Sequence, residues 1–230
     1  MPPVLWYKYK MQEIETHGLK WLVGDQHSDD GMAPSDHEHV LDSTFRELLG
    51  NGVLLDIGAH SGHWTVRMAQ QASKVIAVEA NPDTADLLKK NIALNGFTNV
   101  TVLTVAAWDR PVLLRFEDPK GEQIRSGTLR TVEAGPDDPG AVMGVPLDFL
   151  LDGEPEITLV KMDVEGADLH VLRGLRLTLE RLRPKMLIER HDFYGYYTAD
   201  ELFGLLDEFG YGHRDAPLWF GEAHLICEPR

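Results

Sequence analysis

Cysteine is nearly absent from this chain: Cys227 is the only one among 230 residues, so no internal disulfide can form. A lone thiol is typical of a reducing compartment, where we expect it to be a buried structural residue. No apolar run approaches the roughly 18 residues that a membrane-spanning helix needs. The N-terminal residues also lack the charged-then-apolar pattern of a secretion signal. These absences predict a cytoplasmic protein with no membrane partner.

Basic residues are scarce as well: 22 Lys and Arg face 37 Asp and Glu, which gives a formal net charge of −15. Such a charge repels polyanions, so it disfavours nucleic acid and favours a small-molecule substrate. Neither G-x-S-x-G nor G-x-x-x-x-G-K-[ST] occurs, which argues against a serine hydrolase and a nucleotide triphosphatase. The composition leaves both a monomer and a homodimer open.

Short apolar runs alternate with amphipathic stretches along most of the chain, which predicts an α/β fold with a doubly wound sheet. No Pro/Gly/Ser-rich linker divides it, so we expect a hairpin and lid over 1–39 and one main domain over 40–230. The hairpin is expected within 5–23, and a second one is expected as an insertion over 112–131. Expected strands are 53–57, 75–78, 100–105, 157–162, 185–190, 211–214 and 224–228; expected helices end at Leu49 or span 63–72, 82–96, 167–182 and 199–210.

The residues after the first main strand indicate a nucleoside-cofactor site. Two glycines frame a loop in which the backbone can approach a ligand closely. The middle glycine of G-x-G-x-x-G is missing, and Asp56 at the strand tip would repel a phosphate. S-adenosylmethionine has an ammonium and a sulfonium and no phosphate, so this pattern favours it over NAD; a plain loop cap is the alternative for Asp56. The loop consists of Gly58, Ala59, His60, Ser61 and Gly62.

A second acid, Glu79, follows the next strand, 21 residues beyond Gly58. That offset suits a carboxylate that binds ribose hydroxyls, and Ala80 and Asn81 come directly after it. Farther along, small residues lead into Ala107 and Trp108, where an adenine ring could lie against the chain. An ordinary core position for Trp108 explains the same residues equally well.

Asp163, Glu165 and His191 follow two of the expected strands, so their side chains should share one cleft mouth. Either carboxylate could orient or deprotonate a hydroxyl, and each should raise the pKa of the other. The alternative is a pair of acids that favour a helix N-terminus. His191 is a second candidate base, with a structural role as its alternative. Asp163 is also expected to contact the cofactor.

Two polar segments carry weaker signals. One segment could offer nitrogen and oxygen ligands to a metal, but its irregular spacing is more typical of a surface loop or lid, so no metal ligands are expected there. It contains His27, Asp29, Asp30, Asp36, His37 and His39. Three residues of the inserted hairpin could help to bind a substrate: Arg125, Ser126 and Thr128.

Four segments in this order, DIGAHSG, VEANP, LVKMDVEGAD and IERH, resemble the FkbM family of S-adenosylmethionine-dependent methyltransferases over about residues 40–228. The resemblance implies a Rossmann-like class I methyltransferase fold, with six parallel strands and one antiparallel strand. It also implies that Asp56, Gly58 and 60–62 line the methionine part of the cofactor. Glu79 would hold the ribose, and Asn81 with 107–108 would flank the adenosine. His60 stands where the family often has Asn.

These observations predict a methyltransferase that modifies a hydroxyl on a sugar or secondary metabolite. An RNA methyltransferase is the first alternative, because VEANP followed by KKNIALNG also resembles some transfer-RNA enzymes. A regulatory protein that binds the cofactor without turnover is the second.

Overall fold

The computed structural model describes residues 11–24, 39–117, 130–216 and 223–230. Within them, seven strands form a central sheet in the order β12-β13-β11-β10-β3-β4-β5. β13 runs antiparallel to both strands beside it, and the other six strands are parallel to one another, so the expected arrangement of six parallel strands and one antiparallel strand is confirmed. The strands are β3 Val53–Ile57, β4 Lys74–Val78, β5 Val100–Leu103, β10 Leu159–Met162, β11 Lys185–Arg190, β12 Tyr211–Asp215 and β13 Ala223–Pro229.

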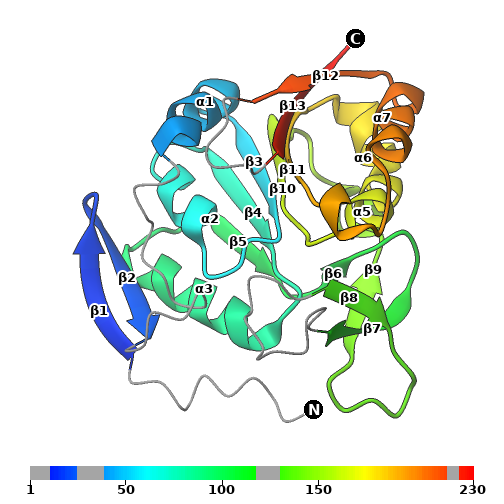
Figure 1. Cartoon of the computed structure of the whole chain (residues 1–230). Coiled ribbons are helices and arrows are strands. Elements are labelled where there is room, and N and C mark those ends of the chain that lie inside the picture. The colour runs from blue at the N-terminus through cyan, green and yellow to red at the C-terminus, as the bar shows by residue number, and fades with distance from the viewer. Residues whose placement is uncertain (1–10, 25–38, 118–129, 217–222) are drawn as a thin grey trace.

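Helices cover both faces of this sheet (Figure 1), as the apolar strands require. Side chains along a strand point alternately to its two faces. Leu54 therefore packs in a cluster with Phe45, whereas Leu55 packs in a cluster with Leu172 and Leu206. One layer holds α1 His39–Leu49, α2 His63–Met68 and α3 Pro82–Leu94; the other holds α5 Asp168–Gly174, α6 Arg176–Leu182 and α7 Ala199–Glu208.

Local capping signals fix where several helices begin and end. The Asn81 side chain accepts hydrogen bonds from the first backbone N–H groups of α3, and Pro82 occupies the first turn. Thr198 forms a capping box with Glu201 at the start of α7. Because these signals are local, the sequence predicts α3 and α7 almost to the residue.

The single helix expected over 167–182 is wrong, since the chain breaks into α5 and α6 at Leu175. Gly174 lies so close to Trp108 that a Cβ added there would be 1.9 Å from the Trp108 carbonyl oxygen. The break therefore coincides with a contact that is distant in sequence, and the leucine periodicity continues through it. Leu172, Leu175 and Leu179 are all buried.

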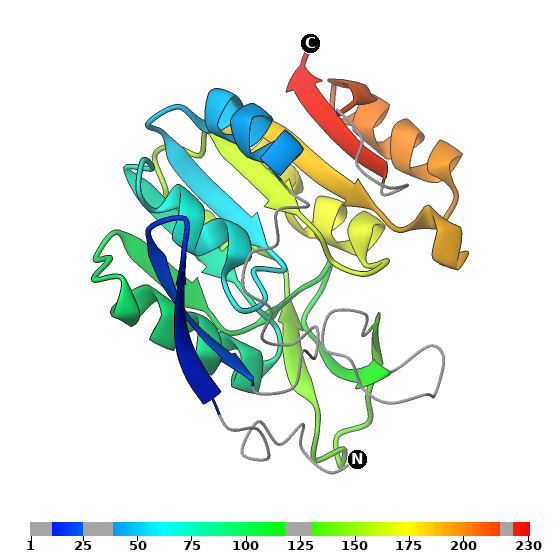
Figure 2. The same ribbon diagram turned by 60° about the vertical axis from the view of Figure 1, so that its left-hand side comes forward.

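A smaller sheet with the order β6-β9-β7-β8 lies on the side toward which the parallel strands of the main sheet point (Figure 2). The hairpin expected over 112–131 is confirmed in its described part by the antiparallel pairing of β7 and β8. β9 was not expected; it pairs with β7 and with the two-residue β6. The strands are β6 Ala106–Ala107, β7 Val112–Glu117, β8 Arg130–Glu133 and β9 Val142–Val145, and the short helix α4 Asp148–Leu151 follows.

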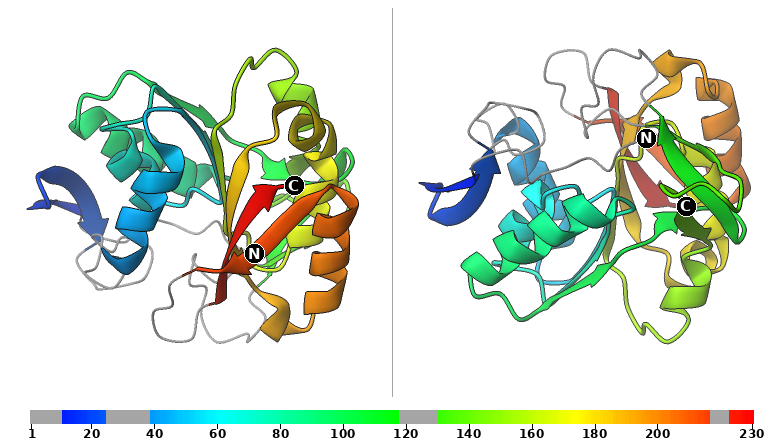
Figure 3. Two further views of the ribbon diagram at one scale, coloured as in Figure 1. Left: turned by 90° about the horizontal axis from the view of Figure 1, so that it is seen from above. Right: turned by 90° about the horizontal axis from the view of Figure 1, so that it is seen from below.

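The N-terminal hairpin, β1 Met11–Thr16 with β2 Leu19–Gly24, is also confirmed. It lies on the outer side of the layer that holds α1 to α3, away from α7 (Figure 3). The backbone N–H of Leu22 donates to Asn91 Oδ1 of α3 at 2.8 Å. The expected lid, with His27, Asp29, Asp30, Asp36 and His37, lies outside the described residues, as do Arg125, Ser126 and Thr128.

Two further expectations concern the lone cysteine and the lack of long apolar runs. Cys227 is fully buried in β13, as expected, and burial raises the pKa of its thiol to about 12. Among the described helices, none is long and apolar enough to cross a membrane.

Candidate active site

The loop after β3 is held tightly against neighbouring strand ends. The backbone N–H groups of Gly58 and Ala59 both donate to the Val78 carbonyl oxygen, at 2.9 and 3.0 Å. Gly58 has a φ of +77°, and a Cβ added there would lie 1.7 Å from the Asp163 carbonyl oxygen. Gly62, with a φ of +102°, leads into α2. Glycine at position 58 is therefore required by backbone packing as well as by backbone conformation.

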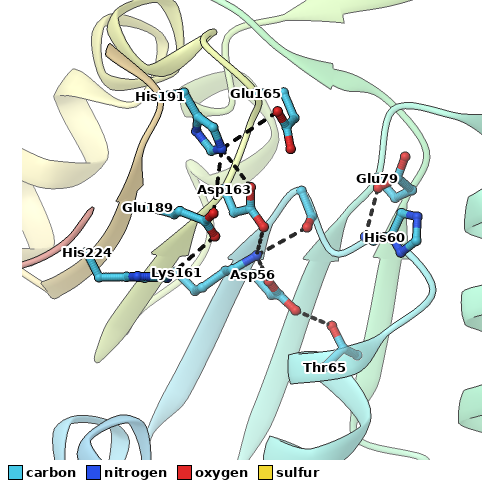
Figure 4. Close-up of polar contacts among 11 residues, drawn as sticks. Asp56, His60, Thr65, Glu79, Lys161, Asp163, Glu165, Glu189, His191 and His224 are labelled. Carbon is cyan, nitrogen blue, oxygen red and sulfur yellow. Dashed lines mark hydrogen bonds and ion pairs between the residues drawn. The ribbon is translucent and has the colours of Figure 1, made fainter. Parts of the chain in front are cut away.

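Glu79, at the end of β4, faces this loop (Figure 4). Its Oε2 accepts the His60 N–H at 2.9 Å, and its Oε1 accepts the Asn81 N–H at 2.8 Å. The residue is 8% exposed. Burial raises the pKa of Glu79 to about 7, although the two N–H groups act in the opposite direction. Each carboxylate oxygen has a further lone pair, so the group has the chemistry to accept ribose hydroxyls.

Other residues predicted to bind the cofactor are used in part to join the loop to α3. The Ser61 carbonyl oxygen accepts a hydrogen bond from the Asn91 side chain at 2.9 Å. Asn81 caps α3, as described above, and Ala59 is buried beside the loop. Ala80 is partly buried against the main core. Contacts of these residues with a cofactor stay predictions.

Asp56 lies beneath the loop with no exposed surface. Its Oδ2 accepts the Thr65 hydroxyl at 2.6 Å, and its Oδ1 lies 3.9 Å from Lys161 Nζ. Burial raises the pKa of Asp56 above its ordinary value, and Lys161 and Thr65 offset part of that rise. Lys161 thus already lies beside Asp56, and the preference of Asp56 for a ligand with a positive end stays a prediction. Its direct contact with a cofactor stays a prediction.

Lys161 is a site residue that the sequence reasoning missed. Its Nζ donates to Asp163 Oδ2 at 3.1 Å and to the Gly58 carbonyl oxygen at 3.3 Å. Burial alone lowers the pKa of Lys161, but the carboxylates of Asp163 and Asp56 outweigh that effect and raise it. The available signal was a lysine inside the otherwise apolar strand LVKM, where a charge is found only when it is paired.

The three predicted catalytic residues do converge. Nε2 of His191 lies 3.7 Å from Asp163 Oδ1, from Glu165 Oε2 and from Glu189 Oε1 (Figure 4). His191 is 2% exposed, whereas the carboxylate side chains are about a fifth to a third exposed. His224 adds a further contact, with its Nε2 3.4 Å from Glu189 Oε2. A histidine surrounded by carboxylates therefore stands at the ends of β10 and β11.

Electrostatics within this cluster differ from the expectation. Burial favours a raised pKa for Asp163, but Lys161 and then His191 outweigh it, so the pKa is held below its ordinary value. The prediction that neighbouring carboxylates raise the pKa of Asp163 is therefore wrong, because Lys161 lies closer. Glu165 has a φ of +50°, a left-handed conformation that is uncommon for a residue with a side chain. Such backbone strain is concentrated at functional sites.

Trp108 is buried and stacks on His170, with ring centroids 3.9 Å apart and planes inclined by 10°. His170 Nδ1 in turn lies 2.8 Å from Asp109 Oδ2. Ala107 is buried next to Trp108 in β6. Trp108 is thus a core residue in this structure, and its contact with adenosine stays a prediction.

The sequence pattern of the methyltransferase FkbM domain matches residues 56–212, which include every part of the site described above except His224. The chain belongs to this family. The structure of the FkbM methyltransferase from Methylobacillus flagellatus KT aligns with a TM-score of 0.52 at 19% identity, over 79% of this chain and 45% of that one. A precorrin-6y C5,15-methyltransferase from Geobacter metallireducens GS-15 aligns with a TM-score of 0.53 at 15% identity, over 89% and 94%. These likenesses confirm the class I methyltransferase fold.

Curated relatives match shorter segments of this FkbM-family chain. A probable ribosomal RNA small subunit methyltransferase A from Methanosphaera stadtmanae is 34% identical over 80 residues, 35% of this chain and 27% of that protein. A tRNA/tmRNA (uracil-C(5))-methyltransferase from Aeromonas salmonicida is 29% identical over 133 residues, 53% and 35% respectively. The chain thus spans about a quarter to a third of these relatives. Membership of a methyltransferase family implies S-adenosylmethionine as the methyl donor.

Proposed function

We propose that this protein is an S-adenosylmethionine-dependent O-methyltransferase that acts on a hydroxyl of a small molecule, a sugar or a secondary metabolite. The observation that carries this proposal is the convergence of Asp163, Glu165 and His191 beside the loop at 58–62. Ligands of open α/β sheets bind outside the carboxyl ends of the strands, which is where both features lie.

The residues near the loop fit this cofactor. Glu79 is a buried carboxylate next to the His60 and Asn81 backbone, and it would accept the ribose hydroxyls. The loop at 58–62 would lie against the methionine part. S-adenosylmethionine supplies a methyl group on a sulfonium, which is electrophilic without further activation.

The chain's own task is then to orient an acceptor hydroxyl and take its proton. Asp163 stays anionic because Lys161 lowers its pKa, so it is a weak base suited to orientation. Glu165 is partly exposed in the loop after β10 and faces the same histidine. We assign Glu165 as the group that receives the proton while the oxygen bonds to the methyl carbon and the sulfur retains the electron pair. His191 holds the carboxylates around the acceptor.

Charge supports a small acceptor over RNA. Curated relatives that modify RNA share only segments of the chain. The net charge of −15 opposes binding of a polyanion. The acid cluster at the ends of β10 and β11 adds local negative charge at the place where an RNA would have to enter.

Calorimetry with S-adenosylhomocysteine tests the cofactor site, and transfer of a radiolabelled methyl group tests the acceptor. We expect saturable binding, and transfer to hydroxylated small molecules but not to transcribed tRNA. Glu165→Gln should lower kcat by about 10²- to 10⁴-fold, the range typical of a lost general base, with unchanged S-adenosylhomocysteine affinity. Glu180→Gln, an exposed acid on α6, is the matched control and should behave as wild type.

Three results would overturn parts of the proposal. No binding of S-adenosylhomocysteine would exclude the methyltransferase function. Methylation of tRNA in preference to small molecules would exclude the acceptor class. Tight binding without transfer to any acceptor would instead support a non-catalytic cofactor-binding protein.

A further inference from the structure

We propose that Asp163, Glu189 and His191 form a binding site for a divalent metal ion. One ligand atom from each residue lies within 4.8 Å of the other two. His191 Nε2 is 3.7 Å from both Asp163 Oδ1 and Glu189 Oε1. Zn²⁺ and Mg²⁺ hold ligands at about 2.0 to 2.2 Å, which places neighbouring ligand atoms about 3 to 4 Å apart. Small side-chain rotations would therefore complete the coordination.

The outer contacts of both carboxylates support this assignment. Asp163 uses Oδ2 to accept from Lys161 Nζ at 3.1 Å, and Glu189 has Oε2 3.4 Å from His224 Nε2. Each carboxylate thus has one oxygen beside a nitrogen base or cation and the other oxygen directed at His191 (Figure 4). Metal ligands in proteins are characteristically held in this way by outer partners that fix their orientation.

The charges of the cluster call for a cation. Asp163, Glu165 and Glu189 place three carboxylates around one nitrogen of a nearly buried histidine. Lys161 pairs with Asp163 and with Asp56, and His224 lies beside Glu189. Like charges at a poorly solvated site are costly without compensation. A divalent ion would supply two positive charges at the point where the carboxylates meet.

The ligand types indicate which metals fit. An imidazole nitrogen with two carboxylate oxygens suits Mn²⁺ or Zn²⁺ better than Ca²⁺, which prefers oxygen ligands alone. Three protein ligands leave coordination positions for other oxygens. Resting on the proposed function, we infer that these positions receive the acceptor hydroxyl and a neighbouring oxygen of the same acceptor. A metal-bound hydroxyl loses its proton more readily, and Glu165 lies on the same side to receive it.

Electron paramagnetic resonance with Mn²⁺ alone tests the site, on chelator-treated full-length protein without cofactor or acceptor. We expect the signal of free Mn²⁺ to fall with one saturable site per chain. Glu189→Gln should weaken binding at least about tenfold, whereas Glu228→Gln, a carboxylate near the opposite end of the adjacent strand, should not. Electron spin-echo modulation from a directly bound nitrogen should be present in wild type and absent in His191→Gln.

Absence of a saturable site would overturn the proposal, and so would equal affinity of wild type and Glu189→Gln. Bound Mn²⁺ whose nitrogen modulation persists in His191→Gln would place the ion elsewhere. Because S-adenosylhomocysteine binding is measured separately, the two proposals fail independently. Mn²⁺ binding without S-adenosylhomocysteine binding would contradict the proposed function and support the metal site. S-adenosylhomocysteine binding without Mn²⁺ binding would contradict the metal site alone.

Discussion

Lys161 Nζ lies 3.1 Å from Asp163 Oδ2 in the interior of the sheet, and the same ammonium is 3.9 Å from Asp56. Lys161 thereby connects the C-terminal ends of β3 and β10. The cofactor loop follows β3, and two residues of the carboxylate cluster follow β10. A buried charge is tolerated only when it is paired, and here one lysine serves two acids. Lys161 therefore helps to fix the positions of the cofactor loop and of the carboxylate cluster, although it is assigned no contact with the cofactor or with the acceptor.

Lys161→Met should destabilise the protein by about 3 to 5 kcal/mol at pH 7, because it removes the ammonium that pairs with the buried Asp56 and with the partly buried Asp163. Urea denaturation measures this loss. In wild type the pKa of Asp163 is lowered, so its contribution is present above the unfolded pKa and is lost only as pH falls below that value. In the variant both acids should have raised pKa values, so the deficit should shrink between pH 7 and pH 5.

The double variant Lys161→Met, Asp56→Asn is the control for this explanation. Removing the carboxylate charge of Asp56 should recover part of the stability that is lost in Lys161→Met. A single Lys161→Met variant within about 0.5 kcal/mol of wild type would contradict the pairing, since that is the range of an ordinary surface substitution.

Gly58→Ala should be far more disruptive than Gly96→Ala. Both glycines have positive φ, +77° and +69°, so both variants incur the left-handed penalty of about 1 to 2 kcal/mol. At Gly96 no atom lies within 4 Å of an added Cβ, whereas at Gly58 the Asp163 carbonyl oxygen is 1.7 Å away. We expect a loss above about 3 kcal/mol for Gly58→Ala, together with weaker S-adenosylhomocysteine binding. Equal losses in urea denaturation would contradict the close packing of β3 on β10.

Much of the fold could be predicted because its signals are local. Apolar runs locate most of the seven strands, although β12 is largely polar, and Asn81 and Thr198 mark helix starts. The break at Leu175 could not be predicted from the leucine periodicity, which continues through it, and the close approach of Gly174 to Trp108 beside it exists only in the folded chain. β9 was missed for a similar reason: its four residues gain their structure from pairing with β6 and β7.

In the site, too, the features that could be predicted have local signals, whereas contacts distant in sequence could not be predicted. Asp163, Glu165 and His191 could be grouped because each follows a parallel strand, and parallel strand ends share one edge. The pKa of Asp163 is lowered and not raised, because the Lys161 ammonium, two residues earlier, lies 3.1 Å from its carboxylate. The pairing of Lys161 with Asp56 could not be predicted, because it requires β3 and β10 to be neighbours in the sheet. Neither segment of sequence indicates which strand lies beside it.

Glu79 should make cofactor binding depend on pH. Burial raises its pKa to about 7, so at pH 6 the carboxyl group is mostly protonated and accepts hydroxyl donors poorly. S-adenosylhomocysteine affinity should therefore increase about tenfold between pH 6 and pH 8, as the ionised fraction does for one group with that pKa. Calorimetry at both pH values checks this. Glu79→Gln should bind more weakly at pH 8 and lose the pH dependence, and a flat wild-type profile would refute the assignment.

Ionisation of Glu79 should strengthen cofactor binding but lower the stability of the fold without cofactor. Its folded pKa of about 7 lies above the ordinary value of 4.5, so the folded chain holds more protons than the unfolded chain between these values. The contribution of Glu79 to stability without cofactor should therefore fall as pH rises through that window. Urea denaturation at pH 5 and pH 8 should show a smaller difference for Glu79→Gln than for wild type.

Glu165→Gly should be more stable than Glu165→Ala, although both lose methyl transfer. Both substitutions remove the carboxylate, so they differ only in the backbone freedom at a φ of +50°. An Ala keeps the Cβ that disfavours this conformation, whereas Gly adopts it freely, and the difference should be about 1 kcal/mol in urea denaturation. The strain at Glu165 would then be a stability cost kept for the sake of catalysis. Ala equal to or more stable than Gly would mean that the loop relaxes out of the left-handed conformation once the carboxylate is gone, so that the cluster around His191 imposes the strain.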